Sequence, residues 1–119
     1  METRPAGVVV AVPLDGPNVG QRWGKADRVA VALVQDGDVV WWVESAVGWD
    51  ESHDAGSEGQ HHASVARFLR EQSIDVVAAD HVGAGMARML SSMDIALVTG
   101  ARGPARDAVL SAARSTQHD

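Results

Sequence analysis

The stretch that decides the fold runs from Ile74 to Val98 and reads Ile74-Asp-Val-Val-Ala-Ala-Asp80-His81-Val-Gly-Ala-Gly-Met-Ala-Arg-Met-Leu-Ser-Ser-Met-Asp-Ile-Ala-Leu-Val98. Its first residues form a short apolar run that ends at turn residues, which is typical of a strand buried on both faces. Methionines and a leucine then recur at helical spacing before a second apolar run. We therefore predict a strand–loop–helix–strand unit whose two strands are parallel neighbours. Its loop follows the carboxyl end of a strand, where open α/β sheets bind ligands.

Length and composition limit the class of protein. A chain of 119 residues is long enough for one core, and we predict a single domain over 1–119, with the core at 7–114 and a frayed tail at 115–119. No apolar run reaches the roughly 20 residues that span a bilayer, and no signal-peptide pattern is present, so we expect a cytoplasmic protein without a membrane partner. The net charge of −6 disfavours a nucleic-acid partner. Cysteine is absent, which excludes disulfides, thiol catalysis and thiolate metal ligands.

Three further strands are predicted before the central unit. The run Val8–Val12 is continuously apolar and is followed by Pro13, where we expect the first strand to end. Two β-rich runs, Arg28–Val34 and Asp38–Glu44, flank the dipeptide Asp36-Gly37. Because Asp-Gly between such runs is the strongest short hairpin signal, these runs should form an antiparallel pair.

Helices account for most of the remaining chain. The polar, acidic segment 45–59 is predicted to be a loop, and Ser57-x-x-Gln60 has the pattern of a capping box that opens a helix. Pro104 fits the first position of a last helix. The resulting order, βββαβαβα, predicts an α/β fold with a mixed five-stranded sheet and flanking helices, a ribonuclease H-like motif. The alternative is a purely parallel, flavodoxin-like sheet, which the hairpin disfavours.

The loop Asp80–Gly85 is the first candidate site. Its glycines let backbone amides approach a ligand, and the helix after it directs its positive end there; the alternative is that the glycines only form a tight turn. His62 falls on the apolar stripe of the preceding helix and could converge with His81 on a metal, since imidazole suits borderline metals. The alternatives are a histidine at the edge of the core and a solvated one.

Two other classes of function stay open. Asp15 and Asp80 with a divalent metal would suit a phosphoesterase or nuclease, although the first strand carries no acid of the kind such enzymes place on the sheet. The tryptophans and the acidic loop would suit a protein–protein interaction module. Trp41 and Trp42 face opposite sides of one strand, so one of them should lie near a surface or an interface.

Taken together, residues 8–98 resemble the dinitrogenase iron–molybdenum cofactor biosynthesis family, small carriers of metal clusters for nitrogenase. The resemblance rests on the segment Gly20-Gln-Arg-Trp-Gly-Lys-Ala-Asp27, the hairpin, His61-His62, Ile74-Asp-Val-Val, His81-Val-Gly-Ala-Gly, Leu90 and Asp94-Ile95. Family members commonly carry His-Phe-Gly-(Arg/Lys)-Ala after the first loop, and here the pattern reads Arg22-Trp23-Gly24-Lys25-Ala26. The histidine position therefore holds Arg22, a fixed cation suited to an anionic ligand.

The resemblance implies a ribonuclease H-like fold and a non-enzymatic role in binding an iron–sulfur or iron–molybdenum type cluster, or a similar anion. It also implies a maturation protein as partner. We expect the site residues to converge in one cleft. Arg22 would supply charge there and Trp23 a wall. Gly24 and Gly83 would allow close approach of the backbone, and His62 and His81 would be the metal ligands.

Overall fold

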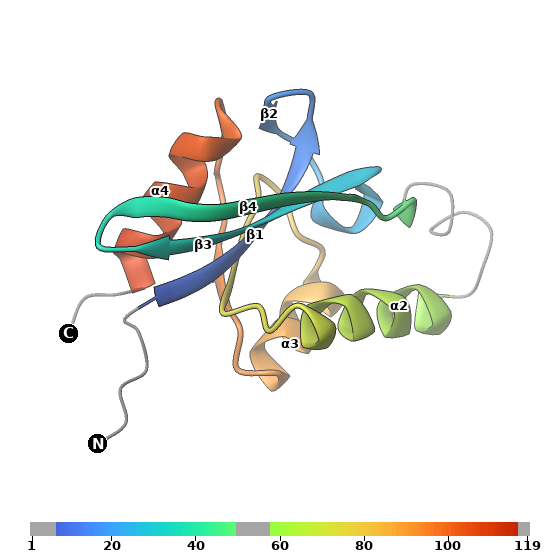
Figure 1. Ribbon diagram of the computed structural model, residues 1–119. Helices are drawn as coiled ribbons and strands as arrows, with labels where there is room; N and C mark the ends of the chain where they lie inside the picture. The colour runs from blue at the N-terminus through green and yellow to red at the C-terminus, as the bar shows by residue number, and fades with distance from the viewer. Residues whose placement is uncertain (1–6, 50–57, 117–119) are drawn as a thin grey trace, which may run out of the picture.

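The computed structural model describes residues 7–49 and 58–116 (Figure 1). In chain order its elements are β1 (Gly7–Asp15), β2 (Asn18–Val19), the 3₁₀ turn η1 (Trp23–Lys25), β3 (Arg28–Gln35), β4 (Asp38–Ala46), α2 (Glu58–Glu71), β5 (Val76–Ala78), α3 (Ala84–Ser92), β6 (Ala96–Val98) and α4 (Ala105–Thr116). No helix in these two ranges is both long enough and apolar enough to cross a membrane.

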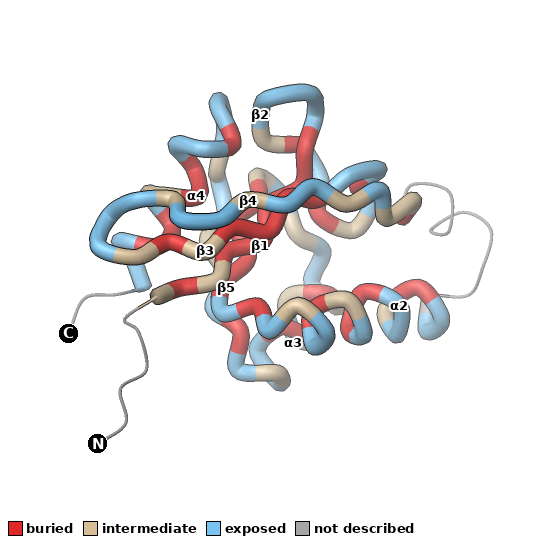
Figure 2. Tube along the Cα trace, viewed as in Figure 1, coloured by how far each residue is buried: buried red, intermediate tan, exposed pale blue. Residues whose placement is uncertain are grey.

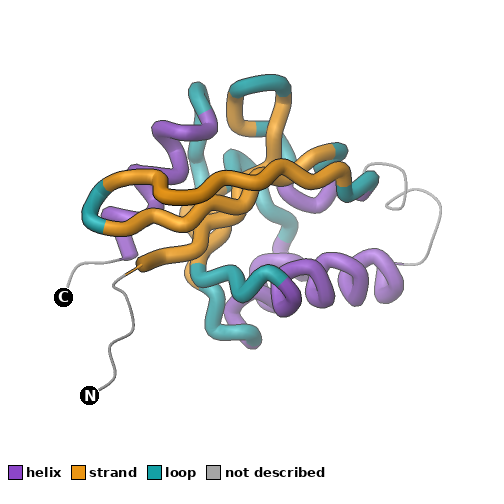
Figure 3. The backbone as a smooth tube through the Cα atoms, in the orientation of Figure 1, coloured by secondary structure: helices purple, strands orange, loops and turns teal. Residues whose placement is uncertain are grey.

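The strands, drawn in orange in Figure 3, form one mixed sheet. Their order is β4-β3-β1-β5-β6, and the short β2 pairs with the end of β1. The strand β3 is antiparallel to both β1 and β4, whereas β5 is parallel to both β1 and β6. The mixed α/β fold predicted from the sequence is therefore confirmed, and the parallel flavodoxin-like alternative is wrong.

The hairpin between β3 and β4 turns at the predicted dipeptide. Asp36 and Gly37 have φ values of 53° and 80°, so both central residues adopt the left-handed conformation that a type I′ turn requires. Beyond the turn the register shifts by one residue, because Val39 pairs with Val34 whereas Trp41 pairs with Leu33. The residue between them, Val40, is the extra residue of a β-bulge.

Pro13 does not end the first strand, contrary to the sequence prediction. The strand β1 continues to Asp15, and Pro13 pairs with Val29 of β3. The carbonyl oxygen of Pro13 accepts a hydrogen bond from the Gly20 amide, 2.8 Å away on the β2 side. The N–H and the carbonyl of one strand residue point to the same side of the strand, so an N–H at position 13 would face away from β3. Its absence from proline therefore removes no hydrogen bond between β1 and β3.

Two hydrophobic cores lie on opposite faces of the sheet, and β1 contributes side chains to both of them. Helices α2 and α3 cover one face and α4 covers the other (Figure 1), so the middle strands are buried along most of their length (Figure 2). Alternation along β1 separates the two cores: Ala11 belongs to the first, and Val10 and Val12 belong to the second.

Two boundaries differ from the sequence prediction. Pro104 lies just before α4, and its carbonyl accepts the helical hydrogen bond from Ala108, so it is the N-cap rather than the first helical residue. The helix runs to Thr116, two residues into the predicted tail, where the Thr116 hydroxyl donates to the Ala112 carbonyl at 3.2 Å. Ser57 and most of the predicted acidic loop lie outside the described residues.

The turn gives a direct test of this fold. Gly37→Val should lower the free energy of unfolding by about 1–2 kcal/mol, because a side chain is placed in the left-handed conformation. Asp36→Gly, in the same turn, should change the free energy of unfolding much less. Glycine adopts the positive φ of this position without strain, but it also makes the unfolded chain more flexible, and the two effects oppose each other. Urea unfolding followed by circular dichroism measures both, and an equal loss in the two variants would contradict the turn assignment.

Candidate functional site

The loop after β2 and the loop after β5 are joined through their backbones. The His81 amide donates to the Gln21 carbonyl at 3.1 Å, and the Trp23 amide donates to the His81 carbonyl at 3.2 Å. Arg22 and His81 thereby form an isolated parallel bridge. Two segments about 60 positions apart in sequence are thus held side by side at the carboxyl-terminal edge of the parallel strands.

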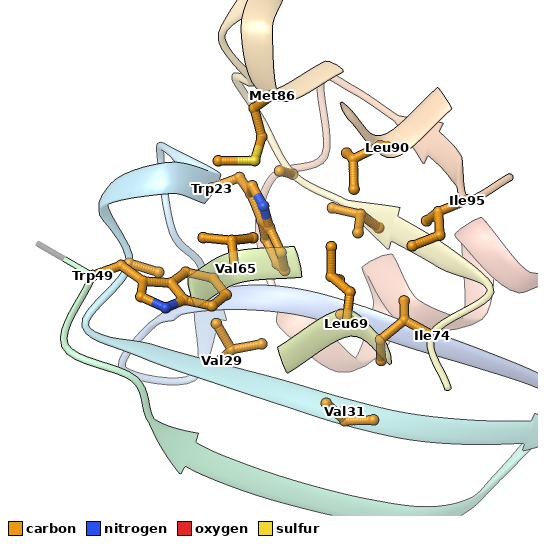
Figure 4. Packing of buried hydrophobic residues seen from close by; sticks show 14 residues of the cluster. Trp23, Val29, Val31, Trp49, Val65, Leu69, Ile74, Met86, Leu90 and Ile95 are labelled. Atoms are coloured by element: carbon orange, nitrogen blue, oxygen red, sulfur yellow. The ribbon is translucent and has the colours of Figure 1, made fainter. Parts of the chain in front are cut away.

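Trp23 anchors the first of these loops in the core. Its side chain is completely buried and meets Trp49 edge to face, with ring centroids 5.1 Å apart (Figure 4). Trp49 in turn packs against Phe68 of α2 at 5.5 Å. The sequence analysis expected Trp23 to form a wall of the site, whereas the structure places it beneath the site, among the buried side chains. Burial of this large apolar ring is favourable, and it fixes the position of the loop above it.

A cavity of about 400 Å³ opens between the two loops. We call it the cationic cavity, because its lining includes three basic side chains and no carboxylate: it is formed by Gln21, Arg22, Gly24, Lys25, His81, Val82 and Gly83. Arg22 directly precedes the turn η1 and Lys25 is its last residue, so the two cations flank one short turn. The arrangement is suited to an anion.

The amino-terminal end of α3 adds to this positive character. Gly83 is the N-cap residue, no side chain caps the helix, and the first turn has no acidic residue. The first amides of a helix have no intrahelical partner and carry the positive end of the helix dipole. Gly83 also lines the cationic cavity, so the start of α3 lies at its boundary.

A second cavity of about 180 Å³ adjoins the first and shares Gly24 and Gly83 with it. We call it the histidine cavity; its other lining residues are His61, His62, Ala84, Gly85 and Met86. His61 is only 4 % exposed, whereas His62 is partly exposed. The sequence analysis assigned His62 to the buried stripe of α2, but it is His61, four residues before the buried Val65, that is on this stripe.

The predicted metal ligands lie in neighbouring cavities. His81 lines the cationic cavity and His62 lines the histidine cavity. Within residues 7–49 and 58–116, no group of three or more histidine, aspartate or glutamate side chains could hold a metal ion.

The three glycines of the histidine cavity differ in the room that they leave for a side chain. A Cβ atom on Gly85 would lie 3.2 Å from His62 Cε1, and one on Gly24 would lie 3.5 Å from His61 Nε2. Gly83 has a φ of −64°, and a Cβ there would meet no heavy atom within 4 Å. Small residues thus let the histidines approach the start of α3.

The Asp80 carboxylate has two basic neighbours, Arg102 and, with Nε2 3.9 Å away, His81. The carboxylate lies 3.2 Å from Arg102 Nε, the Asp80 side chain is 13 % exposed, and its backbone carbonyl accepts from the Gly100 amide at 3.1 Å. The loop before α4 is therefore tied to the loop that carries His81. Asp15 lines a third cavity, of about 290 Å³, which Asp80 does not line. Asp15 and Asp80, the carboxylates considered for a phosphoesterase or nuclease, therefore do not line a common cavity among these three.

Arg22, Gly24, His81 and Gly83 thus line one cavity, as the sequence analysis expected. Gln21 and Lys25, to which the sequence analysis gave no role, also line the cationic cavity. Val82 belongs to the predicted loop Asp80–Gly85 and His61 to the predicted helix start, and the structure places them in the cationic and the histidine cavity, respectively. Lys25 could have been found from the basic position of the family pattern.

Comparison with known proteins supports the same fold. The family model for the dinitrogenase iron-molybdenum cofactor matches residues 7–115. The crystal structure of PH0822 superposes with a TM-score of 0.71 at 17 % identity, over 91 % of this chain and 92 % of that one. A Methanocaldococcus jannaschii protein provisionally described as a dinitrogenase gives a TM-score of 0.61 at 14 % identity, over 88 % and 86 % of the two chains. No curated protein matches the sequence significantly.

The fit around Gly85 can be tested directly. Gly85→Ala should displace the His62 ring, because the added methyl would lie 3.2 Å from its Cε1 atom, tighter than van der Waals contact. The His62 Cε1–H resonance in a ¹H–¹³C NMR spectrum should shift. Gly83→Ala, in the same helix start but with open space, should leave it in place. An unshifted His62 signal in Gly85→Ala would refute this packing.

Proposed function

We propose, since this chain belongs to the dinitrogenase iron-molybdenum cofactor family, that it is a non-enzymatic carrier of an anionic metal cluster or a similar anion. The observation that carries the proposal is the cationic cavity, which is lined by Arg22, Lys25, His81 and the N-cap residue of α3, Gly83, and by no carboxylate. Positive side chains together with helix amides form the usual protein environment for anions.

The available donors favour binding by charge rather than by thiolate ligation. The chain has no cysteine, so a cluster could not be held through protein sulfur. Arg22 offers a planar fork of donors and Lys25 a compact positive charge. His81 and His62 could add imidazole ligation from the two adjoining cavities. An iron–sulfur or iron–molybdenum type cluster would be the cargo, held by its negative charge and by backbone amides.

The exposure of the site suits a cargo that is passed on. The His81 side chain is 65 % exposed, and Arg22 and Lys25 are exposed as well. Exposed charges hold a ligand less tightly than buried ones, because water and salt screen them. We therefore propose delivery to a maturation protein in the cytoplasm.

The enzymatic alternative has less support. A metal-dependent phosphoesterase or nuclease needs carboxylates that converge on a divalent ion. Asp80 is instead paired with Arg102, and Asp15 lines a cavity that Asp80 does not reach. We propose that the protein catalyses no reaction.

The anion proposal can be tested with tetrathiomolybdate, a molybdenum–sulfur dianion that absorbs visible light. Arg22→Ala should weaken its binding about ten- to hundredfold, because a charge-assisted contact contributes roughly 1.5–3 kcal/mol. Arg22→Lys should give a smaller loss, because the charge stays and the fork is removed. Spectroscopic titration of anaerobically purified protein measures the affinities.

Arg114→Ala is the matched control. Arg114 lies in the last turn of α4 and lines none of the three cavities, so removing the same charge there should change the affinity little. Equal affinity in wild type and Arg22→Ala would remove Arg22 from the site. Equal losses in Arg22→Ala and Arg114→Ala would indicate only a general effect of net charge.

Absence of catalysis is a separate prediction. Incubation with magnesium or manganese should leave an RNA–DNA hybrid and simple phosphate esters uncleaved, since Asp80 is held by Arg102. Gel analysis and phosphate release measure the two activities. Cleavage that is lost in Asp80→Asn would overturn the carrier proposal in favour of a nuclease.

A further inference from the structure

The outer edge of the sheet at β4 carries an unusual surface. Among the described residues, the exposed large hydrophobic side chains all belong to this strand: Val40 is 56 % exposed, Trp41 44 % and Val43 43 %. The strand pairs only with β3, so its other edge presents backbone groups with no strand partner in the described part of the chain. An apolar edge of this kind is a template for pairing with another strand.

The sequence of β4 lacks most of the features that protect an edge. It is nine residues long and contains neither lysine nor proline, whereas the opposite edge strand, β6, has three residues. The one interruption is the bulge at Val40, and from Trp41 to Ala46 the strand pairs regularly with β3. A straight segment of six residues is therefore open to a partner.

We propose that this segment pairs antiparallel with the same segment of a second copy, with Val43 opposite Val43 at a two-fold axis. Val43 and Trp41 oppose Val31 and Leu33 within the chain, so they lie on the α2 and α3 face of the sheet. The register places Trp41 opposite Ser45 of the second copy. The two Val43 side chains then meet across the axis, and each Trp41 lies diagonal to Val43 of the other copy on the same face.

The other face supplies the charge complementarity. Trp42 opposes Ala32 on the α4 face, and the Arg106 guanidinium lies over the Trp42 ring, 5.9 Å from its centroid. Within the chain, Trp42 Nε1 donates to Glu44 Oε2 at 3.1 Å, so this carboxylate already lies on the α4 face. In the proposed register Glu44 of the second copy lies opposite Trp42, on the face that also carries Arg106. The two-fold axis repeats the arrangement, so each copy supplies one cation and one carboxylate.

Other registers are less favourable. Pairing centred on Glu44 would set two carboxylates opposite each other, and pairing centred on Trp41 would oppose Asp38 with Glu44. Pairing centred on Trp42 would set Glu44 against Val40, where the bulge disrupts the strand. Self-complementary pairing of one patch with itself is the geometry of a two-fold dimer, which favours a second copy over an unrelated protein.

The dimer should be concentration-dependent, because a contact confined to one strand is smaller than a standard interface. Sedimentation equilibrium of the full chain measures it. Val43→Glu should weaken the dimer at least about tenfold, since two carboxylates would then face each other at the axis. Ala96→Glu, which puts the same charge on the exposed β6 edge, should leave it unchanged.

A charge exchange tests the register. Glu44→Arg and Arg106→Glu should each weaken the dimer, and the double variant should restore it, because the opposite charges meet again across the axis. Circular dichroism checks that each variant is folded. A wild type that stays monomeric up to about 1 mM, the weak end of specific association, would overturn the proposal. A dimer insensitive to Val43→Glu, or one that the double exchange does not restore, would overturn it too.

Discussion

The site depends on two backbone hydrogen bonds between loops that are distant in sequence. The amides of His81 and Trp23 donate to the carbonyls of Gln21 and His81, and this exchange sets Arg22 beside His81. Each such bond contributes only about 0.5–1.5 kcal/mol net. Burial of Trp23 is worth more, since removal of a buried tryptophan side chain typically costs about 3–5 kcal/mol. The position of the loop is thus determined mainly by a core side chain, and the hydrogen bonds set its register.

The sequence predicted the fold well where patterns are local. The Asp36-Gly37 turn, the buried β5 run and the helical spacing of Met86 and Leu90 each follow from neighbouring residues. The end of β1 was predicted wrongly at Pro13. The side on which an N–H of this residue would point depends on the position of β2, which is a feature of the tertiary structure.

The site was predicted only in part, for similar reasons. Glycines and basic residues indicated the correct loops, and Arg22, Gly24, His81 and Gly83 do share a cavity. The sequence could not show whether His61 or His62 lies on the buried stripe of α2. Neighbouring helical residues point in different directions, so a shift of one residue in the assumed stripe exchanges a buried and a partly exposed position. The burial of Trp23 depended on Trp49, about 26 positions away, and no local pattern carries such a contact.

The bridge between Arg22 and His81 uses only main-chain atoms. Neither side chain is needed to hold the loops, and both project into an open cavity. Substitution at these two positions can therefore alter what the protein recognises with little effect on its folding. The backbone is thus a constant frame in which the two contact residues can be exchanged. The same frame can be adapted to ligands of different chemistry one residue at a time.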